Sequence, residues 1–241
     1  MTHIRFTLQE VADYLHVSVE DIETLVKRRE IPFELAGSRP VFVRVEIDAW
    51  ASRRLLGFSR GPLADYHRKS SAKMHNLDRD SAIISELLRP DFVACGLASR
   101  TKASIIRDMV AIADAAGILS DRTELVDSIT ARERMCSTAL AGGMAILHPQ
   151  HHLPYLADDS FVLLARTVQP IPFGSPDGQT TDVFFLVCSQ DERIHLHVLA
   201  RICMLCYHTA LLASLRECTS AAEMHALVVQ QEIELIRSMD G

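Results

Sequence analysis

Three histidines lie close together in the segment GGMAILHPQHHLPY, residues 142–155. His148 ends a short apolar run, and His151 and His152 follow within four residues. Such a group of imidazoles has three interpretations: metal ligands, a nucleophile, or side chains of a polar loop. Each chemistry requires different companions elsewhere in the chain.

A zinc site needs three or four ligands at rigid spacing. His148, His151 and His152 lie around two prolines, and the chain has no HExxH motif. A second candidate group lies in an apolar helical segment and consists of Cys203, Cys206 and His208. A cysteine pair on one helix face is typical of a packed core. The sequence therefore predicts no metal site and no cofactor, and it predicts a solvated loop for His151 and His152.

A histidine that attacks phosphorus needs little covalent machinery, because positioning and electrostatics carry phosphoryl transfer. It needs a cation near the transferred oxygens and a second group that orients the phosphoryl group. Arg132 precedes the apolar run that ends in His148, and His195 opens the next long helical segment. The N–H groups at a helix N-terminus add anion affinity. These three residues are therefore the candidates for a nucleophilic site.

Helices and strands alternate around these candidates. Helical periodicity predicts helices over 99–117, 121–135, 192–215 and 220–239. Strand-like apolar runs occupy 143–148, 161–168 and 182–189. Ser99 is the expected cap of the first helix and Gly117 its stop, and Ser220 and Glu223 form a capping box for the last. This mixed order predicts an α/β sandwich.

The first part of the chain has a different pattern. Thr7 is the expected cap of a helix over 8–15, and Ser18 caps a second helix after a tight turn. Short strands around Gly37 predict a hairpin, and a third helix closes the unit. Two short helices followed by a hairpin make a winged helix-turn-helix. The predicted domains are 1–56, a polar linker at 57–80, and 81–241.

Composition sets the broad class. Of the 241 residues, 48% are hydrophobic, which is enough for two ordinary domains. The N-terminus lacks an apolar signal-peptide region. The most apolar stretch, 195–215, carries Arg201 and three histidines, which favours a core helix over a membrane span. Six cysteines in apolar segments are typical of buried reduced thiols, so we expect a cytoplasmic protein without membrane contact.

The stretches ITARERMCSTALAGGMAILH, QPIPFGSPDGQTTDVFFLV and HLHVLARI resemble a known family. Residues 85–237 look like the IIA domain of the bacterial phosphoenolpyruvate-dependent sugar phosphotransferase system, of the fructose/mannitol type and closest to its nitrogen-regulatory branch. The resemblance implies an α/β sandwich with a mixed sheet and helices on both sides. It also implies a phosphohistidine carrier, not a stand-alone turnover enzyme, that takes its phosphoryl group from a small phosphocarrier protein.

The same resemblance implies roles for individual residues. His148 corresponds to the phosphoryl acceptor, His195 to its partner histidine, and Arg132 to the arginine near the phosphate. Ser137 or Thr138 would contribute a hydroxyl to phosphate binding.

The sequence departs from the family at the acceptor, where IPHG is usual and this chain has ILHP. Pro149 fixes φ and removes a backbone N–H beside His148. The loss of one hydrogen bond to a charged group costs about 1.5–3 kcal/mol. Two interpretations therefore stay open: an active acceptor, and a degenerate, unphosphorylated fold that acts as a protein-interaction or ligand-sensing module.

The N-terminal features EVADYLHVS, the following IP, Gly37 with Arg39, and EIDAW resemble the excisionase/MerR-like helix-turn-helix family over residues 5–56. The resemblance implies DNA contacts by Ser18, Thr24, Lys27, Arg28, Arg29 and Arg39. The second helix also carries Glu20, Asp21 and Glu23, and carboxylates near DNA repel phosphate. DNA binding and protein contact therefore both remain as interpretations of this domain.

Together these features predict a regulator. Phosphorylation of His148 would add negative charge to a surface patch and change partner choice, and so the output of the N-terminal domain. A transport component is the competing class, but a DNA-binding-like domain beside the IIA-like one favours transcription regulation. The expected partners are the phosphocarrier protein, DNA, a regulatory target protein and a second copy of the chain in a homodimer.

Overall fold

The structure is a computed structural model that describes residues 5–15, 17–44, 46–47, 50–51, 54, 83–150, 155–190 and 192–239. The chain divides into two compact units, Met1–Arg79 and Asp80–Gly241. Each unit is described by itself. The expected linker, 57–80, lies outside the described residues.

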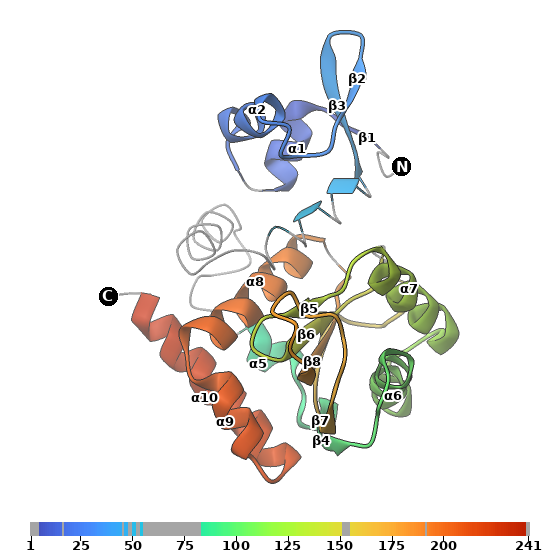
Figure 1. The fold of residues 1–241 in the computed structure, drawn as a ribbon, viewed down its shortest axis with the longest axis vertical. Coiled ribbons are helices and arrows are strands. Elements are labelled where there is room, and N and C mark those ends of the chain that lie inside the picture. The colour runs from blue at the N-terminus through green and yellow to red at the C-terminus, as the bar shows by residue number, and fades with distance from the viewer. Residues whose placement is uncertain are drawn as a thin grey trace. The chain divides into compact units, whose positions relative to one another are not determined.

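The first unit combines two short helices with a small antiparallel sheet (Figure 1). Its elements are β1 (Arg5–Phe6), α1 (Leu8–Tyr14), α2 (Val19–Lys27), β2 (Glu34–Ala36) and β3 (Arg39–Val43), with strand order β1-β3-β2. Val11, Ile22 and Phe42 are fully buried and centre the core of this unit. The described residues between Arg44 and Arg54 are helical, where a third helix was expected.

Both predicted caps of this unit are confirmed as capping boxes. The Thr7 hydroxyl accepts from the Glu10 N–H at 3.3 Å, and the Glu10 carboxylate accepts from the Thr7 N–H at 2.7 Å. Ser18 and Asp21 make the same exchange at 3.0 and 3.2 Å. Each box satisfies N–H groups that a helix start leaves open, so it fixes where the helix begins.

The second unit is built on a five-stranded mixed sheet with the order β4-β7-β8-β6-β5. The strands are β4 (Val93–Leu97), β7 (Phe161–Ile171), β8 (Thr181–Cys188), β6 (Met144–Leu147) and β5 (Ala139–Leu140). Pairs β4·β7 and β6·β8 are parallel, whereas β7·β8 and β5·β6 are antiparallel. Residues Val183 to Cys188 of β8 are all buried, as expected for a strand covered on both faces.

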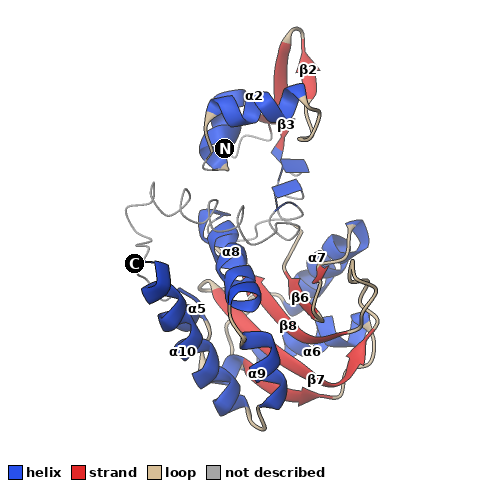
Figure 2. Ribbon diagram, turned by 60° about the vertical axis from the view of Figure 1, so that its left-hand side comes forward, coloured by secondary structure: helices blue, strands red, loops and turns tan. Residues whose placement is uncertain are grey.

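Helices cover the two faces of this sheet (Figures 1 and 2). On one face lie α6 (Lys102–Ala115) and α7 (Arg122–Met135), and on the other lie α5 (Ile83–Leu87), α8 (Glu192–His208), α9 (Leu211–Glu217) and α10 (Ala221–Met239). A short 3-10 helix, Pro90–Phe92, leads into β4. The predicted α/β sandwich with a mixed sheet is confirmed.

Two predicted caps differ from the structure. Helix α6 begins at Lys102 with Thr101 as its N-cap, not with Ser99, whose hydroxyl instead bonds the Asp108 carboxylate. At the last helix, the Ser220 hydroxyl accepts from the Glu223 N–H at 3.2 Å as expected. The Glu223 carboxylate, however, accepts from the N–H and the hydroxyl of Thr219. The bond that the Glu223 carboxylate should receive from the Ser220 N–H in a capping box is thus received from the preceding residue, Thr219.

The single helix expected over 192–215 is two helices, α8 and α9, which are bent by 78°. The Thr209 hydroxyl donates to the carbonyl of Leu205 and accepts from the N–H of Leu211 at 3.0 Å. These bonds serve backbone groups that the break leaves open. No single described helix is long and apolar enough to span a membrane; the α8–α9 pair passes by length and composition only, with this bend between its members.

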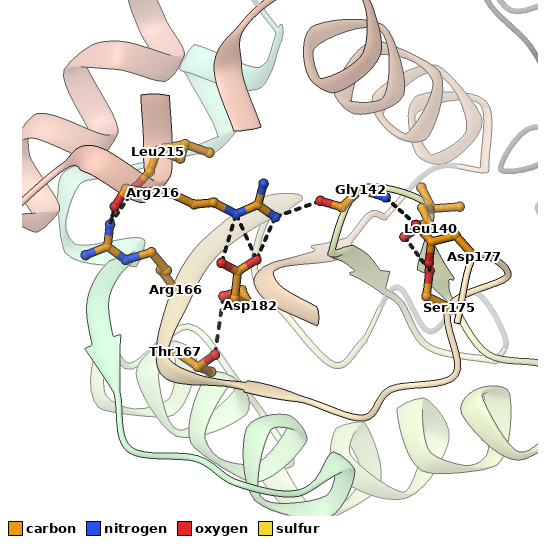
Figure 3. A network of polar contacts seen from close by, with 9 residues as sticks. All are labelled: Leu140, Gly142, Arg166, Thr167, Ser175, Asp177, Asp182, Leu215 and Arg216. Atoms are coloured by element: carbon orange, nitrogen blue, oxygen red, sulfur yellow. Dashed lines mark hydrogen bonds and ion pairs between the residues drawn. The ribbon is translucent and has the colours of Figure 1, made fainter. Parts of the chain in front are cut away.

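The start of β6 is fixed by a charged network at the end of the strand opposite to His148 (Figure 3). Arg216 of α9 donates to both carboxylate oxygens of Asp182 at 2.7–3.1 Å and to the carbonyl of Gly142 at 2.6 Å. Gly143 has φ +82°, and a Cβ there would lie 2.6 Å from the Arg216 guanidinium. The turn therefore requires glycine, and it sets the register that leads to His148.

A buried charged pair ties the beginning of this unit to α8 and α10. Arg201 and Glu232 are both fully buried, with Nη1 and Oε1 at 3.9 Å. The Glu232 carboxylate also accepts from the N–H groups of Ile84 and Ser85 at 2.9 and 2.7 Å. Burial lowers the pKa of Arg201, and the Glu232 charge acts in the opposite direction. Helix α5 thus depends on this carboxylate for its N-terminal hydrogen bonds.

Candidate functional site

His148 follows directly on β6, whose four residues are fully buried. This strand pairs with β8 in parallel, with Leu147 opposite Leu186. The His148 side chain is itself 2% exposed. The apolar strand therefore delivers an imidazole to the end of the sheet and holds its backbone there.

Both ring nitrogens of His148 have defined partners. Nδ1 lies 2.9 Å from the carbonyl oxygen of Ile146, and Nε2 accepts from the Nε–H of Arg132 at 3.0 Å. A carbonyl oxygen only accepts, so Nδ1 carries the proton and Nε2 carries the lone pair. The ring is neutral in this arrangement, and its nucleophilic atom is Nε2.

Arg132 comes from the last turn of α7 and is 3% exposed. Its Nη1 donates to the carbonyl of Cys136 at 3.0 Å, so the turn after the helix fixes the guanidinium. The neighbouring Glu133 stabilises the same turn. Its carboxylate accepts from the Thr138 N–H at 3.0 Å and pairs with Lys102 at 3.0 Å. A guanidinium fixed in this way is a preorganised donor for an anion.

His195 lies in the first turn of α8, on the other face of the sheet from α7. Its ring centroid is 5.2 Å from that of His148, and the two ring planes are inclined by 57°. His195 is half-buried. The structure therefore brings together the three residues that the sequence singled out, each from a different segment.

Burial lowers the pKa of His148 well below its ordinary value of 6.5. Electrostatic interaction with Arg132 and with His195 lowers it further, and the hydrogen bond to Ile146 acts in the opposite direction. An imidazole with a lowered pKa keeps its lone pair at neutral pH, as a nucleophile requires. The group can thus attack an electrophile, with a cation beside it to meet developing negative charge.

The two hydroxyl candidates donate to other protein oxygens in this structure. The Ser137 hydroxyl donates to the carbonyl of Phe173 at 2.6 Å. The Thr138 hydroxyl donates to Glu133 at 2.7 Å, and Thr138 is buried. Both residues therefore fix the turn that holds Arg132.

The segment after the imidazole offers little backbone hydrogen-bonding capacity. Pro149 has no N–H. The next N–H, that of Gln150, lies 3.3 Å from the carbonyl and 3.1 Å from the hydroxyl of Ser128 on α7. His151 and His152 lie outside the described residues.

Some groups of this site leave no mark in the sequence. The carbonyls of Ile146 and Cys136 act through the backbone, which every residue type carries. The sequence places Glu133 next to Arg132 and five residues before Thr138. That its carboxylate binds the Thr138 N–H and so stabilises the turn is visible only in the fold.

The described residues contain no group of three His, Cys, Asp or Glu side chains that could hold a metal ion. Cys203 and Cys206 are buried in α8. Burial raises the pKa of Cys203 to about 12 and that of Cys206 well above its ordinary value. Neither thiol is therefore suited to release the proton that metal ligation requires.

The candidate DNA-contacting residues are all exposed. They lie on α2, directly before or after it, or on β3, and are Ser18, Thr24, Lys27, Arg28, Arg29 and Arg39. Some of their groups already have intramolecular partners. The Ser18 hydroxyl caps α2, the Thr24 hydroxyl donates to the carbonyl of Glu20 at 2.9 Å, and Lys27 lies 3.9 Å from Glu23.

Arg29 is the one described non-glycine residue with a positive φ, at 55°. Its N–H bonds the carbonyl of Val26 and the N–H of Glu30 bonds that of Leu25, which is the Schellman ending of α2. Glycine usually occupies this position, because a side chain there costs roughly 1–2 kcal/mol. Two basic side chains, Arg28 and Arg29, are thus exposed at this end of the helix.

Comparisons with known proteins agree with both halves of this architecture. The family described as phosphoenolpyruvate-dependent sugar phosphotransferase system, EIIA 2, matches residues 86–231, and a helix-turn-helix domain matches residues 5–55. The chain is 29% identical over 147 residues to a nitrogen regulatory protein from Bradyrhizobium diazoefficiens, which covers 60% of this chain and 94% of that relative. It is 26% identical over 151 residues to the fructose-specific EIIABC component from Bacillus subtilis. That match covers 62% of this chain and 23% of the length of that relative.

Solved structures show the same fold. The nitrogen regulatory protein IIA-Ntr from Neisseria meningitidis has a TM-score of 0.55 at 23% identity and covers 61% of this chain and 99% of its own. The IIA mannitol structure from Escherichia coli has a TM-score of 0.52 at 16% identity and covers 58% and 97%. Because the family match extends over more than half of the chain, this protein belongs to the EIIA 2 family of the phosphoenolpyruvate-dependent sugar phosphotransferase system, with a helix-turn-helix domain before the EIIA domain.

Proposed function

We propose that this protein is a regulator whose EIIA domain accepts a phosphoryl group on Nε2 of His148 from a phosphocarrier protein. One observation carries the proposal: the imidazole is neutral, with its proton held at Nδ1 by Ile146 and its lone pair facing Arg132. A second histidine, His195, lies with its ring centroid at 5.2 Å. Nucleophile, cation and orienting group are therefore assembled before any donor arrives.

In the proposed transfer, Nε2 of His148 attacks the phosphorus atom of the donor's phosphohistidine. The N–P bond of the donor breaks, and its imidazole leaves with the electron pair. Arg132 first moves its Nε–H from Nε2, and its guanidinium then binds the phosphoryl oxygens. The proton stays on Nδ1, where it is hydrogen-bonded to the carbonyl of Ile146, so the attack needs no general base.

The regulatory half of the proposal rests on the domain combination. Domains 1–56 and 81–241, joined by a linker at 57–80, would act as output and sensor. A phosphoryl group adds about −1.5 to −2 charges, which is enough to change the partners that a surface attracts. The N-terminal domain would then act on DNA or on a regulatory protein, with a homodimer as the form that binds DNA. The similarity to a nitrogen regulatory protein supports regulation over transport.

The test is phosphorylation of the full-length protein with phosphoenolpyruvate and the general components of the phosphotransferase system. We expect one acid-labile, base-stable phosphate per chain, and none in His148→Asn. Phosphate in His148→Asn, or acid-stable phosphate in the wild type, contradicts the assignment.

The second candidate function is a degenerate EIIA domain that binds partners without phosphorylation. It is favoured by the backbone after the acceptor, where Pro149 has no N–H and the N–H of Gln150 is bound to Ser128. If the wild type takes up no phosphate while Pro149→Gly does, this function is correct.

A further inference from the structure

Two half-buried cysteines, Cys95 and Cys218, approach each other on the EIIA domain. The Cys95 thiol lies 3.9 Å from the carbonyl oxygen of Cys218, and the Cys218 thiol donates to the carbonyl of Ser214 at 3.3 Å. Cys95 pairs with Arg166, which pairs with Val183 of β8. Val183 in turn lies opposite Met144, the first residue of β6. The two thiols are therefore level with the end of the sheet opposite to His148.

Arg166 connects strand β4, which carries Cys95, with the end of α9, which Cys218 follows. Its Nη2 donates to Sγ of Cys95 at 3.3 Å. Its Nη1 donates to the carbonyls of Leu215 and Arg216 at 2.7 and 2.6 Å, in the last turn of α9 (Figure 3). A positive charge thus faces the sulfur of Cys95. A guanidinium N–H that donates to this sulfur can stabilise the negative charge that the sulfur carries as it attacks a peroxide.

Both cysteines lie where the backbone is irregular. Cys95 is on β4, at the edge of the sheet, where the register shifts between Cys95 and Leu97 and Gly96 has φ +88°. Cys218 is the C-cap of α9 with ψ 141°, so the helix has ended at this residue. A disulfide needs Cα atoms roughly 4.4–6.8 Å apart. Sγ of Cys95 lies 3.9 Å from the carbonyl oxygen of Cys218, so the two residues are neighbours. A disulfide requires that the Cys218 side chain leave the carbonyl of Ser214 and that the bulged strand adjust its backbone.

We propose that Cys95 and Cys218 form a reversible disulfide in response to hydrogen peroxide or a related hydroperoxide. The Cys95 sulfur attacks a peroxide oxygen, the O–O bond breaks, and the protonated leaving oxygen departs as water or alcohol. The product at Cys95 is a sulfenic acid. The Cys218 sulfur then attacks this sulfenic sulfur; the S–S bond forms, the S–O bond breaks, and a second water leaves. A cellular dithiol reverses the reaction and is itself oxidised to a disulfide.

The roles of the two thiols follow from their surroundings. Burial, followed by the negative charge of Glu223, raises the pKa of Cys218. Cys218 therefore suits the second step, and Cys95, whose sulfur accepts a hydrogen bond from Nη2 of Arg166 at 3.3 Å, suits the first.

The remaining cysteines provide internal comparisons. Burial raises the pKa of Cys188 and of Cys203 to about 12, so neither should react with peroxide in the folded chain. Cys136 is exposed and directly follows α7, which lies on the face of the sheet opposite to α9. It should react as a single thiol and so report that the oxidant is active.

The experiment treats the full-length protein with hydrogen peroxide and maps its cysteines by mass spectrometry of peptides without reduction. We expect a linked Cys95–Cys218 peptide pair, which dithiothreitol removes and which is lost in Cys95→Ser and in Cys218→Ser. Arg166→Gln should slow formation of the linkage about tenfold, and Arg166→Lys should slow it less. Circular dichroism of each variant shows that the fold is retained.

Two results overturn the proposal. One is oxidation of Cys136 while Cys95 and Cys218 remain reduced in the wild type. The other is a disulfide that joins Cys218 mainly to a cysteine other than Cys95. Both results are measured on the wild-type protein. They therefore do not depend on how well any variant folds, nor on phosphorylation of His148.

Discussion

The Nε–H of Arg132 donates to Nε2 of His148 at 3.0 Å, so the cation occupies the atom from which the proposed attack would start. His148 is at the same time 2% exposed. The described site is therefore closed: its parts are aligned, but the guanidinium must turn aside before a donor reaches Nε2. Nη1 of Arg132 is bonded to the carbonyl of Cys136, so a turn of the guanidinium also strains or breaks this hydrogen bond.

Replacement of Arg132 by Gln should slow phosphoryl transfer to His148 by about 100- to 1000-fold, because one preorganised charge-stabilising donor is lost. Arg132→Lys should be intermediate, since an ammonium keeps the charge but not the planar fork. The measurement is the initial rate of acid-labile phosphate uptake. Arg134→Gln, an exposed change in the same helical turn, is the matched control and should keep the wild-type rate. An Arg132→Gln variant as fast as this control would remove Arg132 from the mechanism.

His148 should also make stability depend on pH. Its native pKa is lowered well below 6.5, chiefly by burial and then by Arg132 and His195. Below pH 6.5 the unfolded chain binds a proton that the native state does not bind, so the free energy of unfolding falls as pH decreases toward the native pKa. Above this window the contribution is constant.

The measurement compares wild type with His148→Gln by urea unfolding from about pH 7.5 to about pH 5. The wild-type stability should decline more steeply on acidification, by up to about 1.4 kcal/mol per pH unit. His225→Gln removes a histidine on α10 outside the site and is the comparison variant. Parallel pH profiles for wild type and His148→Gln would show that the imidazole titrates alike in both states.

Pro149→Gly should leave the rate of phosphoryl transfer unchanged or raise it. The change supplies an N–H beside His148, where the N–H of Gln150 is already bound to Ser128. One additional hydrogen bond to a charged phosphoryl group is worth about 1.5–3 kcal/mol if its geometry is good. A slower Pro149→Gly variant with an intact fold would indicate that the rigid proline positions the imidazole.

Several parts of this arrangement could be predicted from sequence because they rest on local patterns. The apolar run before His148 predicted a buried strand with the imidazole at its end, and the capping pairs Thr7/Glu10 and Ser18/Asp21 mark the real helix starts. The break between α8 and α9 could not be predicted. Apolar periodicity continues through it, and a Thr209 hydroxyl makes hydrogen bonds to the backbone at the break.

The electrostatic detail of the site was also beyond the sequence. The position of the imidazole proton depends on the carbonyl of Ile146, and the orientation of Arg132 depends on that of Cys136. Any residue types at those positions would supply the same carbonyls. Only the three-dimensional course of the backbone decides that these oxygens face the site.

The buried pair Arg201–Glu232 should be a main support of the EIIA domain. Glu232→Gln keeps the shape of the side chain but removes the carboxylate charge beside the buried guanidinium, which should cost about 3–5 kcal/mol. Glu234→Gln, exposed on the same helix, should change stability by less than about 0.5 kcal/mol. Chemical unfolding of the full chain provides both numbers. The double change Glu232→Gln/Arg201→Met should recover part of the loss, since it also removes the buried positive charge. Equal stability of Glu232→Gln and wild type would contradict the argument.

Binding of the N-terminal domain to DNA should be weak for one chain and strongly dependent on salt. The candidate DNA-contacting cations among its described residues, Lys27, Arg28, Arg29 and Arg39, offer about four phosphate contacts, and each contributes roughly −0.9 to the slope of log K against log salt. Carboxylates on α2 oppose this attraction, and Glu23 lies 3.9 Å from Lys27. The full-length protein should therefore bind genomic fragments mainly as a dimer and at low salt.

Two variants test which charges matter for DNA. Arg28→Gln should weaken binding and make the slope less steep by about one contact, because it removes a single exposed cation. Glu23→Gln should strengthen binding, since it removes a repelling carboxylate and releases Lys27 for phosphate. Affinity is measured by fluorescence anisotropy over a salt series with both variants and the wild type. Binding that is insensitive to salt contradicts the phosphate-contact model. The absence of binding at low salt in both wild type and Glu23→Gln would assign this helix-turn-helix to protein contact instead.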